Sequence, residues 1–566
     1  MKHNNHRPYF FRFYFIILLL ILGLIALIFR MIYLNIINRS FLLKQSQARI
    51  MRTVNIPAYR GMILDRNGIP LAVSTPVDAI WANPQIFQAT YQQLLLLAKQ
   101  IDTTPTELKN SILKNRQEKK EFMYLARGLP PEQANDIKDL HIQGIFYERQ
   151  YRRYYPEGPV TAHVIGFTNV DDEGQEGLEL AYNQWLQGLP GIKKVLKDRL
   201  GHVVGNLALI RAPKQGHNLI LSMDSRIQYL AYRILRQTIK ENNAEAGSVV
   251  ILNVKTGEIL AMVNQPSYNP NKRSKIHDSR FRNRAVTDTF EPGSTMKAFS
   301  VAAALNSGKY TPDTLIETSP GWIVIDGHTF NDDGNYGTLT LGGIVKESSN
   351  VGTAKITLSL PPENLWNMLW TMGFGQRTDS GFPGEASCTL IKRRIWRPID
   401  LSTFSFGYGI SVTALQLAHA YAIIAAHGVN YPITFLKLTT SPQGHQVLSQ
   451  KISDEMISIL EMVLQKGGTG TEARVLSYTV AGKTGTAYIA GPAGYDLKNL
   501  HYTASFVGFA PASDPQFVVA VVIRDPRGEH HFGARVAAPA FAKIMGGCLQ
   551  LMGIPPDALK QNDQLT

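Results

Sequence analysis

Ser294 and Lys297 have the residue types and the spacing that nucleophilic catalysis uses. A serine hydroxyl becomes a good nucleophile when a base takes its proton, and a lysine whose pKa is lowered by burial and cationic neighbours can be that base. The Pro-Gly pair at 292–293 interrupts the preceding segment, and the apolar run at 295–305 predicts a helix that stops at 306–308. Ser294 would lie at the helix amino terminus, where free N–H groups favour negative charge, with Lys297 one turn later. Ser-x-x-Lys alone is a common pattern that chance often explains.

Ser348-Ser349-Asn350 forms a second polar motif, inside the segment 345–358. Ser348 could relay a proton, and Asn350 could orient a substrate amide or Lys297. The alternative is a helix cap, because serine and asparagine are favoured cap residues. Taken alone, this motif favours the cap.

Lys483-Thr484-Gly485-Thr486 is the third motif, in a segment with the character of a strand. Glycine lets another backbone approach a strand closely, and the threonines and the lysine could hold a carboxylate. Strand alternation places the two threonines on one face and Lys483 on the other, so Lys483 must reach round a sheet edge to join them. A phosphate-binding loop is excluded, because the required glycine is replaced by Ser477.

The elements around these motifs predict an α+β domain. A strand and an amphipathic helix are expected at 218–240, two strands at 247–264, and two apolar strands at 503–511 and 517–526. Because helix-rich sequence separates these strand groups, we expect an antiparallel sheet with helices packed on it.

The preceding segment, about 45–215, mixes strand and helix signals. Asn67-Gly68 predicts a tight hairpin turn within 62–73, and 86–140 has helical periodicity. Glu176 and Glu179 are interpreted as solvated acids at the positive end of a helix.

Length and composition restrict the class of protein. A chain of 566 residues predicts two or three domains, and its net charge of +14 suits nucleic acid, anionic lipid or an acidic polymer. Nucleic acid is disfavoured because no known binding motif occurs. Cys388 and Cys548 lie far apart, which favours unpaired thiols over a single disulfide. The adjacent pair His530-His531 is interpreted as a surface feature and not as a metal site.

An amino-terminal anchor is predicted from an uncharged run at 13–29, which extends past Arg30 to residue 34. This length is sufficient for a helix to cross a bilayer. Lys2, Arg7 and Arg12 favour a cytoplasmic amino terminus, although Arg30 and Arg39 on the far flank weaken the bias. A cleaved signal peptide is the alternative, but bulky residues stand where a cleavage site would need small ones.

The three motifs together carry a family resemblance. Ser-x-x-Lys, Ser-x-Asn and Lys-Thr-Gly in this order are the signature of penicillin-recognising serine enzymes. With RGMILDRNG, RRYYP, GQEGLE, FEPGSTMKAF, SFGYGISVTALQLAHAYA and AGKTGTA, nearly the whole chain resembles class B penicillin-binding proteins. The FGYGISVT segment looks closer to the septal (division) type than to the elongation type.

The resemblance implies a domain order and a set of partners. The expected segments are a cytoplasmic tail at 1–12, a transmembrane anchor at 13–36, a non-catalytic pedestal at 37–216, a transpeptidase domain at 217–555 and a carboxyl-terminal tail at 556–566. The protein would be a single-pass protein of the bacterial inner membrane, with its catalytic domain outside the cytoplasm at the septum. Its partners would be peptidoglycan stem peptides, a SEDS-family glycosyltransferase and other division proteins, with β-lactams as covalent inhibitors. No metal or cofactor is implied.

The resemblance also implies a role for each motif residue. Ser294 would attack a D-Ala–D-Ala carbonyl and form an acyl-enzyme that an amine of a second stem peptide resolves, with Lys297 as general base. Ser348, Asn350 and Lys483 would serve proton transfer and orientation. The N–H groups of Ser294 and Thr486 would form the oxyanion hole. Substrate binding would fall to Thr484, Gly485 and Thr486, whose two threonine hydroxyls would bind the terminal carboxylate.

Two other functions share these motifs. A serine β-lactamase would need a base that activates water, and no acidic motif of that kind is visible. A non-catalytic β-lactam sensor would need a cytoplasmic signalling region, for which the residues before the anchor leave no room.

Overall fold

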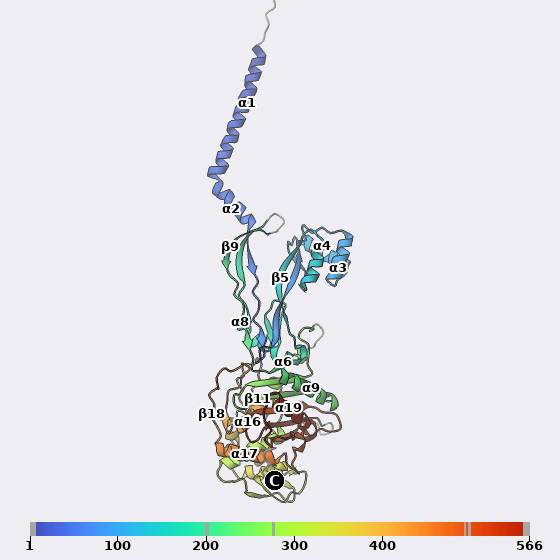
Figure 1. Cartoon of the computed structure of the whole chain (residues 1–566), viewed down its shortest axis with the longest axis vertical. Coiled ribbons are helices and arrows are strands. Elements are labelled where there is room, and N and C mark those ends of the chain that lie inside the picture. Colours follow the sequence, from blue (N-terminus) through green and yellow to red (C-terminus); the bar gives the residue numbers. More distant parts are fainter. Residues whose placement is uncertain (1–6, 198–202, 274–277, 492–493, 496–499, 559–566) are drawn as a thin grey trace, which may run out of the picture. The chain divides into compact units, whose positions relative to one another are not determined.

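The computed structural model describes residues 7–197, 203–273, 278–491, 494–495 and 500–558. Residues 1–6 of the expected cytoplasmic tail, with Lys2, and residues 559–566 of the expected carboxyl-terminal tail lie outside the described residues. The chain divides into two compact units (Figure 1). Unit 1 comprises Met1–Tyr59, Pro76–Tyr151 and Gly188–Gln215, and unit 2 comprises Arg60–Thr75, Arg152–Gln187 and Gly216–Thr566.

Unit 1 begins with the long apolar helix α1 (Arg7–Ile32), which continues into the π-helix η1 (Tyr33–Ile37). The stretch Phe10–Ile37 has 28 residues and a mean hydropathy of 3.0, so its length and composition suit a membrane span. This matches the apolar anchor helix expected from the sequence.

The rest of unit 1 consists of two small assemblies. Strand β1 (Met51–Ile56) pairs with β8 (Gly191–Lys197), which pairs with β9 (Val203–Arg211), all antiparallel. A separate apolar cluster includes Ile80, Leu97, Ile112 and Ile137. The elements around this cluster are β3 (Pro70–Ala82), α3 (Tyr91–Gln100), α4 (Pro105–Gln117), β4 (Met123–Leu129), α5 (Pro131–Lys138) and β5 (Ile145–Tyr154), and α2 (Arg39–Ile50) precedes β1.

Unit 2 is built on a five-stranded antiparallel sheet in the order β12-β11-β21-β20-β19. Its strands are β11 (Ala246–Asn253), β12 (Ile259–Gln265), β19 (Ala481–Tyr488), β20 (Tyr502–Ala510) and β21 (Phe517–Arg524). The first two and the last three strands lie more than 200 residues apart in sequence, and β19 is an edge strand. The expected α+β class with an antiparallel sheet is confirmed.

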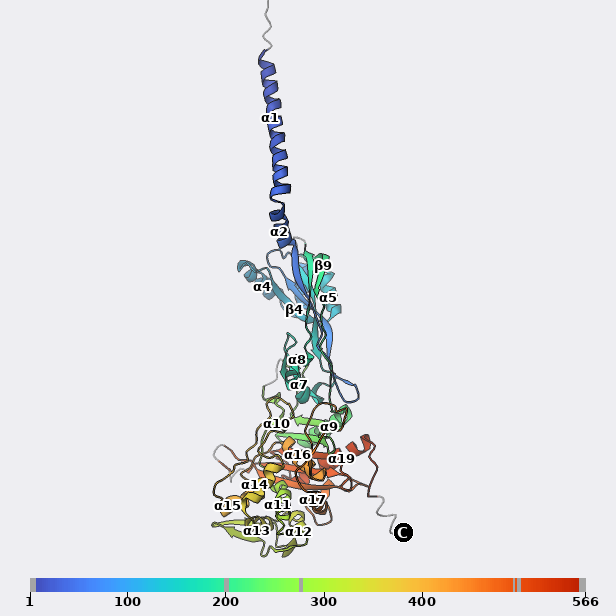
Figure 2. The ribbon, with the colours of Figure 1, turned by 90° about the vertical axis from the view of Figure 1, so that its left-hand side faces the viewer.

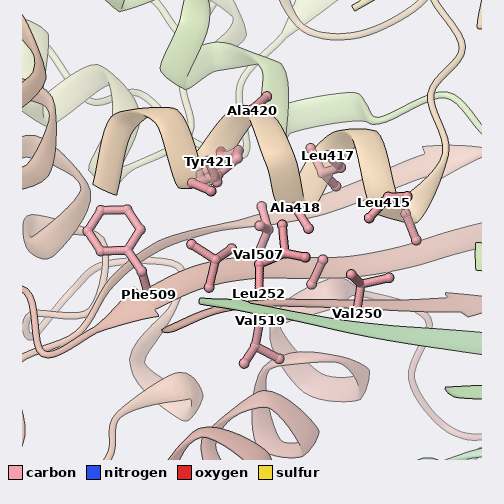
Figure 3. Close-up of a cluster of buried hydrophobic side chains, with 14 of the residues drawn as sticks. Val250, Leu252, Leu415, Leu417, Ala418, Ala420, Tyr421, Val507, Phe509 and Val519 are labelled. Carbon is pink, nitrogen blue, oxygen red and sulfur yellow. The ribbon is translucent and has the colours of Figure 1, made fainter. Parts of the chain in front are cut away.

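Helices cover both faces of this sheet. Figure 3 shows α16 (Ala414–Ala425) lying across the strands, with Leu415, Ala418 and Tyr421 above Val250 and Val507. Helix α9 (Ser225–Glu241) lies on the other face of β11, since a Cβ added to Gly247 would meet side chains of this helix. Helix α9 packs in turn on α19 (Ala538–Leu551). The residues of α16 are buried, and Tyr421 of this helix donates to Thr295 O at 2.8 Å, next to Ser294.

The remaining elements of unit 2 are short or lie around the sheet (Figure 2). They are β2 (Ile63–Leu64), η2 (Gly158–Val160), α6 (Ala162–Ile165), β6 (Phe167–Thr168), β7 (Gly174–Glu176), α7 (Gly177–Ala181), α8 (Asn183–Leu186), β10 (Leu219–Ile220), η3 (Asp278–Arg280), α10 (Arg284–Thr287), η4 (Gly293–Met296), α11 (Lys297–Asn306), β13 (Leu315–Glu317), β14 (Trp322–Ile325), β15 (His328–Asn331), β16 (Thr338–Thr340), α12 (Leu341–Lys346), α13 (Asn350–Leu358), α14 (Pro362–Thr371), α15 (Pro398–Ser405), β17 (Val429–Asn430), β18 (His445–Gln446), α17 (Gln450–Met462), η5 (Thr471–Ala473) and α18 (Gly533–Val536).

The interpretation of Glu179 as a solvated acid is wrong. Its side chain is 0% exposed and accepts hydrogen bonds from Arg60 Nε at 2.6 Å and Arg153 Nε at 2.5 Å. Glu179 does lie in the first turn of α7, as expected. Its burial depends on Arg60, which lies 119 positions earlier in the chain and which no local pattern connects to it. Glu176 is half-buried.

Other local predictions agree with the structure. The predicted hairpin at 62–73 is present as β2 and the start of β3, and Gly68 has the positive φ of 85° that favours glycine at this turn. Cys388 and Cys548 are both unpaired and buried. His530 is exposed, whereas His531 is half-buried and stacks on Tyr502.

Candidate active site

Ser294 lies in the 3₁₀ turn η4, directly before helix α11. The turn packs against β19, and two glycines allow the approach. A Cβ on Gly293 would lie 2.8 Å from Thr486 O, and Gly293 has a φ of 54°. A Cβ on Gly485 would lie 2.8 Å from Thr295 Cγ2 and 2.9 Å from Pro292 O. The short separation of η4 from the edge strand therefore depends on glycine on both sides.

Lys297 is the first residue of α11, and its side chain is only 1% exposed. Its Nζ donates to the backbone O of Ser348 and lies 3.2 Å from Ser348 Oγ. Burial lowers the pKa of Lys297 to about 7, against the opposing effect of Asp332 and Asp333. A large fraction of Lys297 is therefore neutral near neutral pH, as a general base requires.

The second motif contains both a helix cap and a residue of the site. Ser349 is the N-cap of α13 and accepts from Gly352 N at 2.9 Å. Asp332 reinforces this helix end by accepting from Asn350 N at 2.5 Å. Ser348, directly before this cap, has a φ of 57°, and its hydroxyl lies 3.2 Å from Lys297 Nζ.

Lys483 reaches the same hydroxyl from the sheet. Its side chain is 0% exposed, and its Nζ lies 3.0 Å from Ser348 Oγ and 3.1 Å from Thr484 Oγ1. Because β19 is an edge strand, Lys483 can pass round the edge to the side of Thr484. Burial, and then the charge of Lys297, hold the pKa of Lys483 well below its usual value. Ser348 Oγ is therefore a bridge between two buried amines.

A cleft of about 520 Å³ opens onto these groups. Ser294, Lys297, Ser348, Asn350, Thr484 and Thr486 all line it. Asn350 Nδ2 donates to Asn331 O at 2.8 Å, and Thr486 Oγ1 accepts from Gly533 N at 3.0 Å. Gly485 lies in β19 between the two threonines.

Several lining residues were not predicted from the sequence. They are Asp333, Tyr408, Thr469, Ala487, Tyr488, Tyr502, Phe532, Ala534 and Arg535. The rings of Tyr408 and Tyr488 have centroids 6.4 Å apart, and Tyr488 and Tyr502 are 5.3 Å apart, so aromatic faces form one wall. Two of them stand beside recognisable segments, Tyr408 in FGYG and Tyr488 after KTGTA, and this adjacency was the available signal.

Comparison with known proteins agrees with this architecture. The penicillin-binding protein transpeptidase domain matches residues 247–546, and the penicillin-binding protein dimerisation domain matches residues 55–221. The chain is 40% identical to the probable peptidoglycan D,D-transpeptidase PbpC of Pseudomonas aeruginosa, over 98% of this chain and 97% of that protein. It is 42% identical to the peptidoglycan D,D-transpeptidase FtsI of Escherichia coli K12, over 96% of this chain and 92% of that protein.

A solved structure extends the match to nearly the whole fold. Penicillin-binding protein 3 of Mycobacterium tuberculosis, in complex with aztreonam, is 26% identical with a TM-score of 0.68, covering 89% of this chain and 98% of that one. The chain therefore belongs to the penicillin-binding proteins, in the class B group that joins a dimerisation domain to a transpeptidase domain. The family resemblance drawn from the sequence motifs is confirmed.

Proposed function

We propose that this protein is a membrane-anchored peptidoglycan D,D-transpeptidase in which Ser294 forms the acyl-enzyme. The observation that carries the proposal is the position of Ser348 Oγ, 3.2 Å from Lys297 Nζ and 3.0 Å from Lys483 Nζ, in the cleft that Ser294 also lines. Relatives named peptidoglycan D,D-transpeptidase, at about 40% identity over nearly the full length, support the substrate class.

Acylation begins with proton transfer. Neutral Lys297 takes the proton of Ser294 Oγ, which attacks the carbonyl of the D-Ala–D-Ala bond. The oxyanion is stabilised by the backbone N–H groups of Ser294 and Thr486, and such a donor contributes about 3 kcal/mol. When the C–N bond breaks, the departing D-alanine amine takes a proton that Lys297 delivers through Ser348.

Deacylation reverses this sequence with a different amine. An amine of a neighbouring stem peptide attacks the ester carbonyl and gives up a proton through Ser348 and Lys297, and the Ser294 oxygen leaves and is reprotonated. Lys483 holds Ser348 in place from the opposite side, and Asn350 orients the substrate amide. The hydroxyls of Thr484 and Thr486 bind the terminal carboxylate of the donor, beside Gly485.

The cellular setting is part of the proposal. Helix α1 and η1 anchor the protein in the inner membrane, and the residues that follow them lie outside the cytoplasm, where peptidoglycan is made. Residues 37–216 act as a non-catalytic pedestal, and residues 217–555 hold the transpeptidase. The relative named FtsI supports a role at the division septum, with a SEDS-family glycosyltransferase as the partner that supplies glycan strands.

The test is covalent labelling followed by turnover. Intact-mass spectrometry of the full-length protein with penicillin should show one adduct, located on a peptide that contains Ser294. Ser294→Ala should abolish the adduct, whereas Ser307→Ala, at the far end of α11, should keep it. Labelling that survives Ser294→Ala would refute the assignment.

Turnover separates a transpeptidase from a hydrolase. General base catalysis typically raises a rate about 10²–10⁴-fold. Without a base that activates water, hydrolysis of the acyl-enzyme lacks this acceleration, so the penicilloyl adduct should be long-lived. With a thioester donor, product should form faster when a D-amino acid acceptor is added, because the amine intercepts the acyl-enzyme. Rapid multiple turnover of penicillin with no amine-dependent product would identify a β-lactamase instead.

A further inference from the structure

The segment 391–397 places four cationic side chains within seven residues on the surface of unit 2. Lys392, Arg393, Arg394 and Arg397 are all exposed, and Ile395 between them is 80% exposed. This stretch, which we call the basic segment, has no helix or strand of its own and leads directly into α15. It lies outside the three catalytic motifs, and the proposed acyl transfer does not use it.

The fold neutralises the basic segment only in part. Asp400 accepts from Arg397 Nε and Nη2, both at 2.8 Å, and lies 3.6 Å from Arg393. Asp326 is a second nearby carboxylate, held by Ile399 N at 2.9 Å. Within the described part of the chain, no carboxylate pairs with Lys392 or Arg394. A net positive charge therefore remains for an external anion.

Aromatic side chains flank these cations. Trp366 and Trp370 on α14 stack with ring centroids 5.4 Å apart, and Trp370 is 44% exposed. Lys392 Nζ lies 4.5 Å from the centroid of Trp366, which brings the basic segment against α14. Figure 2 shows α14 and α15 on the same side of unit 2. Flat, electron-rich indole faces attract the C–H faces of sugar rings, just as they attract cations.

The basic segment and the catalytic cleft have Tyr408 as a common neighbour. A small hollow is lined by Arg393, Trp396, Asp400 and Tyr408, and Tyr408 also lines the cleft that holds Ser294. Tyr408 therefore borders both the catalytic cleft and the hollow beside Arg393.

We propose that the basic segment and the tryptophans of α14 bind a peptide-bearing glycan strand of peptidoglycan outside the catalytic cleft. Sugar rings stack on Trp370, and stem-peptide carboxylates pair with Lys392 and Arg394. Polymer is favoured over a free stem peptide, because the surface offers both an aromatic face for sugars and cations for carboxylates. The inference rests on the proposed function, since it assigns a second binding site to the same substrate.

The test is co-sedimentation of the full-length, detergent-solubilised protein with purified peptidoglycan sacculi. The double variant K392E/R394E should raise the apparent Kd about fivefold or more, and the difference should shrink at high salt. Trp370→Ala should weaken binding at both low and high salt. The matched control R236E/K240E, with the same charge change on exposed residues of α9, should bind like the wild type.

Parallel assays separate this inference from the proposed function. Penicillin acylation of Ser294 should be unchanged in all three variants, which also shows that they fold. If K392E/R394E is not acylated by penicillin, the co-sedimentation test is made with the single variant Arg394→Gln instead. Wild-type binding by K392E/R394E, or an equal loss in R236E/K240E, would overturn the proposal. It would also be overturned if K392E/R394E lost binding to phosphatidylglycerol vesicles but not to sacculi. Failure of the wild type to acylate would count against the proposed function alone.

Discussion

At the scale of single residues, the protonation state of Lys297 controls the proposed chemistry. Burial lowers its pKa to about 7, so Lys297 is mostly neutral above that pH and mostly charged below it. We expect the rate of acylation by penicillin to level off above about pH 7 and to fall about tenfold per pH unit below it. Formation of a fluorescent penicillin adduct, measured across this range, gives the profile. A rate independent of pH from 5 to 9 would contradict the prediction.

The same base role predicts the effect of Lys297→Arg. Arginine keeps the positive charge but stays protonated at any usable pH, so it cannot accept the Ser294 proton. We expect acylation to fall about 10²–10⁴-fold, the range that general base catalysis contributes. Lys309→Arg, the same change at an exposed position after α11, should leave the rate unaltered. Substantial acylation by Lys297→Arg would mean that Lys297 acts only through its charge.

Gly485 carries a geometric prediction at this scale. An alanine Cβ there would lie 2.4 Å from Ser505 Oγ and 2.8 Å from Thr295 Cγ2, so η4 must move away from β19. We expect Gly485→Ala to slow acylation at least about tenfold and to cost about 1–3 kcal/mol of stability. The control Gly205→Ala meets only Leu196 Cδ1, at 3.7 Å. The rate of adduct formation and the thermal unfolding of the two variants are compared with those of the wild type. Normal acylation by Gly485→Ala would show that the close approach of η4 to β19 is unnecessary.

At the scale of elements, the buried cluster around Glu179 ties distant segments of unit 2 together. Arg60, at 1% exposure, donates to Glu179 and also to Asn183 Oδ1 at 2.7 Å, while Arg153 binds the other oxygen of Glu179. Removing the carboxylate charge would deprive two buried guanidinium groups of the carboxylate that each of them hydrogen-bonds. We expect Glu179→Gln to cost about 3–5 kcal/mol in the free energy of unfolding.

An exposed ion pair provides the control for Glu179. Lys255 and Asp514 lie 2.8 Å apart, with more than half of each side chain exposed, so Asp514→Asn should cost at most about 1 kcal/mol. Chemical denaturation of the full-length protein, with loss of penicillin labelling as a second readout, compares the two variants. Equal small losses would show that the Glu179 cluster contributes little.

The elements also show which features a sequence can predict. The end of α11 follows from an apolar run and the residues that stop it, which are local signals, and the helix ends at Asn306 as expected. Its expected start at Ser294 is instead the 3₁₀ turn η4, and α11 begins at Lys297. The position of Ser348 between two amines could not be read in this way, because it depends on a positive φ and on the meeting of α11, α13 and β19. Glu179 was misinterpreted for the same reason: a helix-start preference contains no information about Arg60. The aromatic wall of the cleft likewise combines side chains from separate loops and strands.

At the scale of the whole molecule, access to peptidoglycan depends on which side of the membrane the residues after the span occupy. The 28-residue stretch Phe10–Ile37 is long and apolar enough to cross a membrane once, and the basic residues on its flanks decide the direction of the crossing. Lys2, Arg7 and Arg12 precede the uncharged core of the span, whereas Arg30, Arg39 and Lys44 follow it. Basic residues that flank a span are favoured on its cytoplasmic side, and we expect Lys2, Arg7 and Arg12 to remain there.

Fusions after residue 45 test this orientation. Alkaline phosphatase, which is active only outside the cytoplasm, should be active there, and green fluorescent protein exported in the same way should be dark. Neutralising Lys2, Arg7 and Arg12 to asparagine should lower phosphatase activity, because it removes the charge that retains the amino terminus. Neutralising Arg39 and Lys44, on the other side of the span, should preserve or raise phosphatase activity, since these charges oppose the crossing. Bright fluorescence with silent phosphatase would place the catalytic cleft in the cytoplasm, away from the proposed substrate.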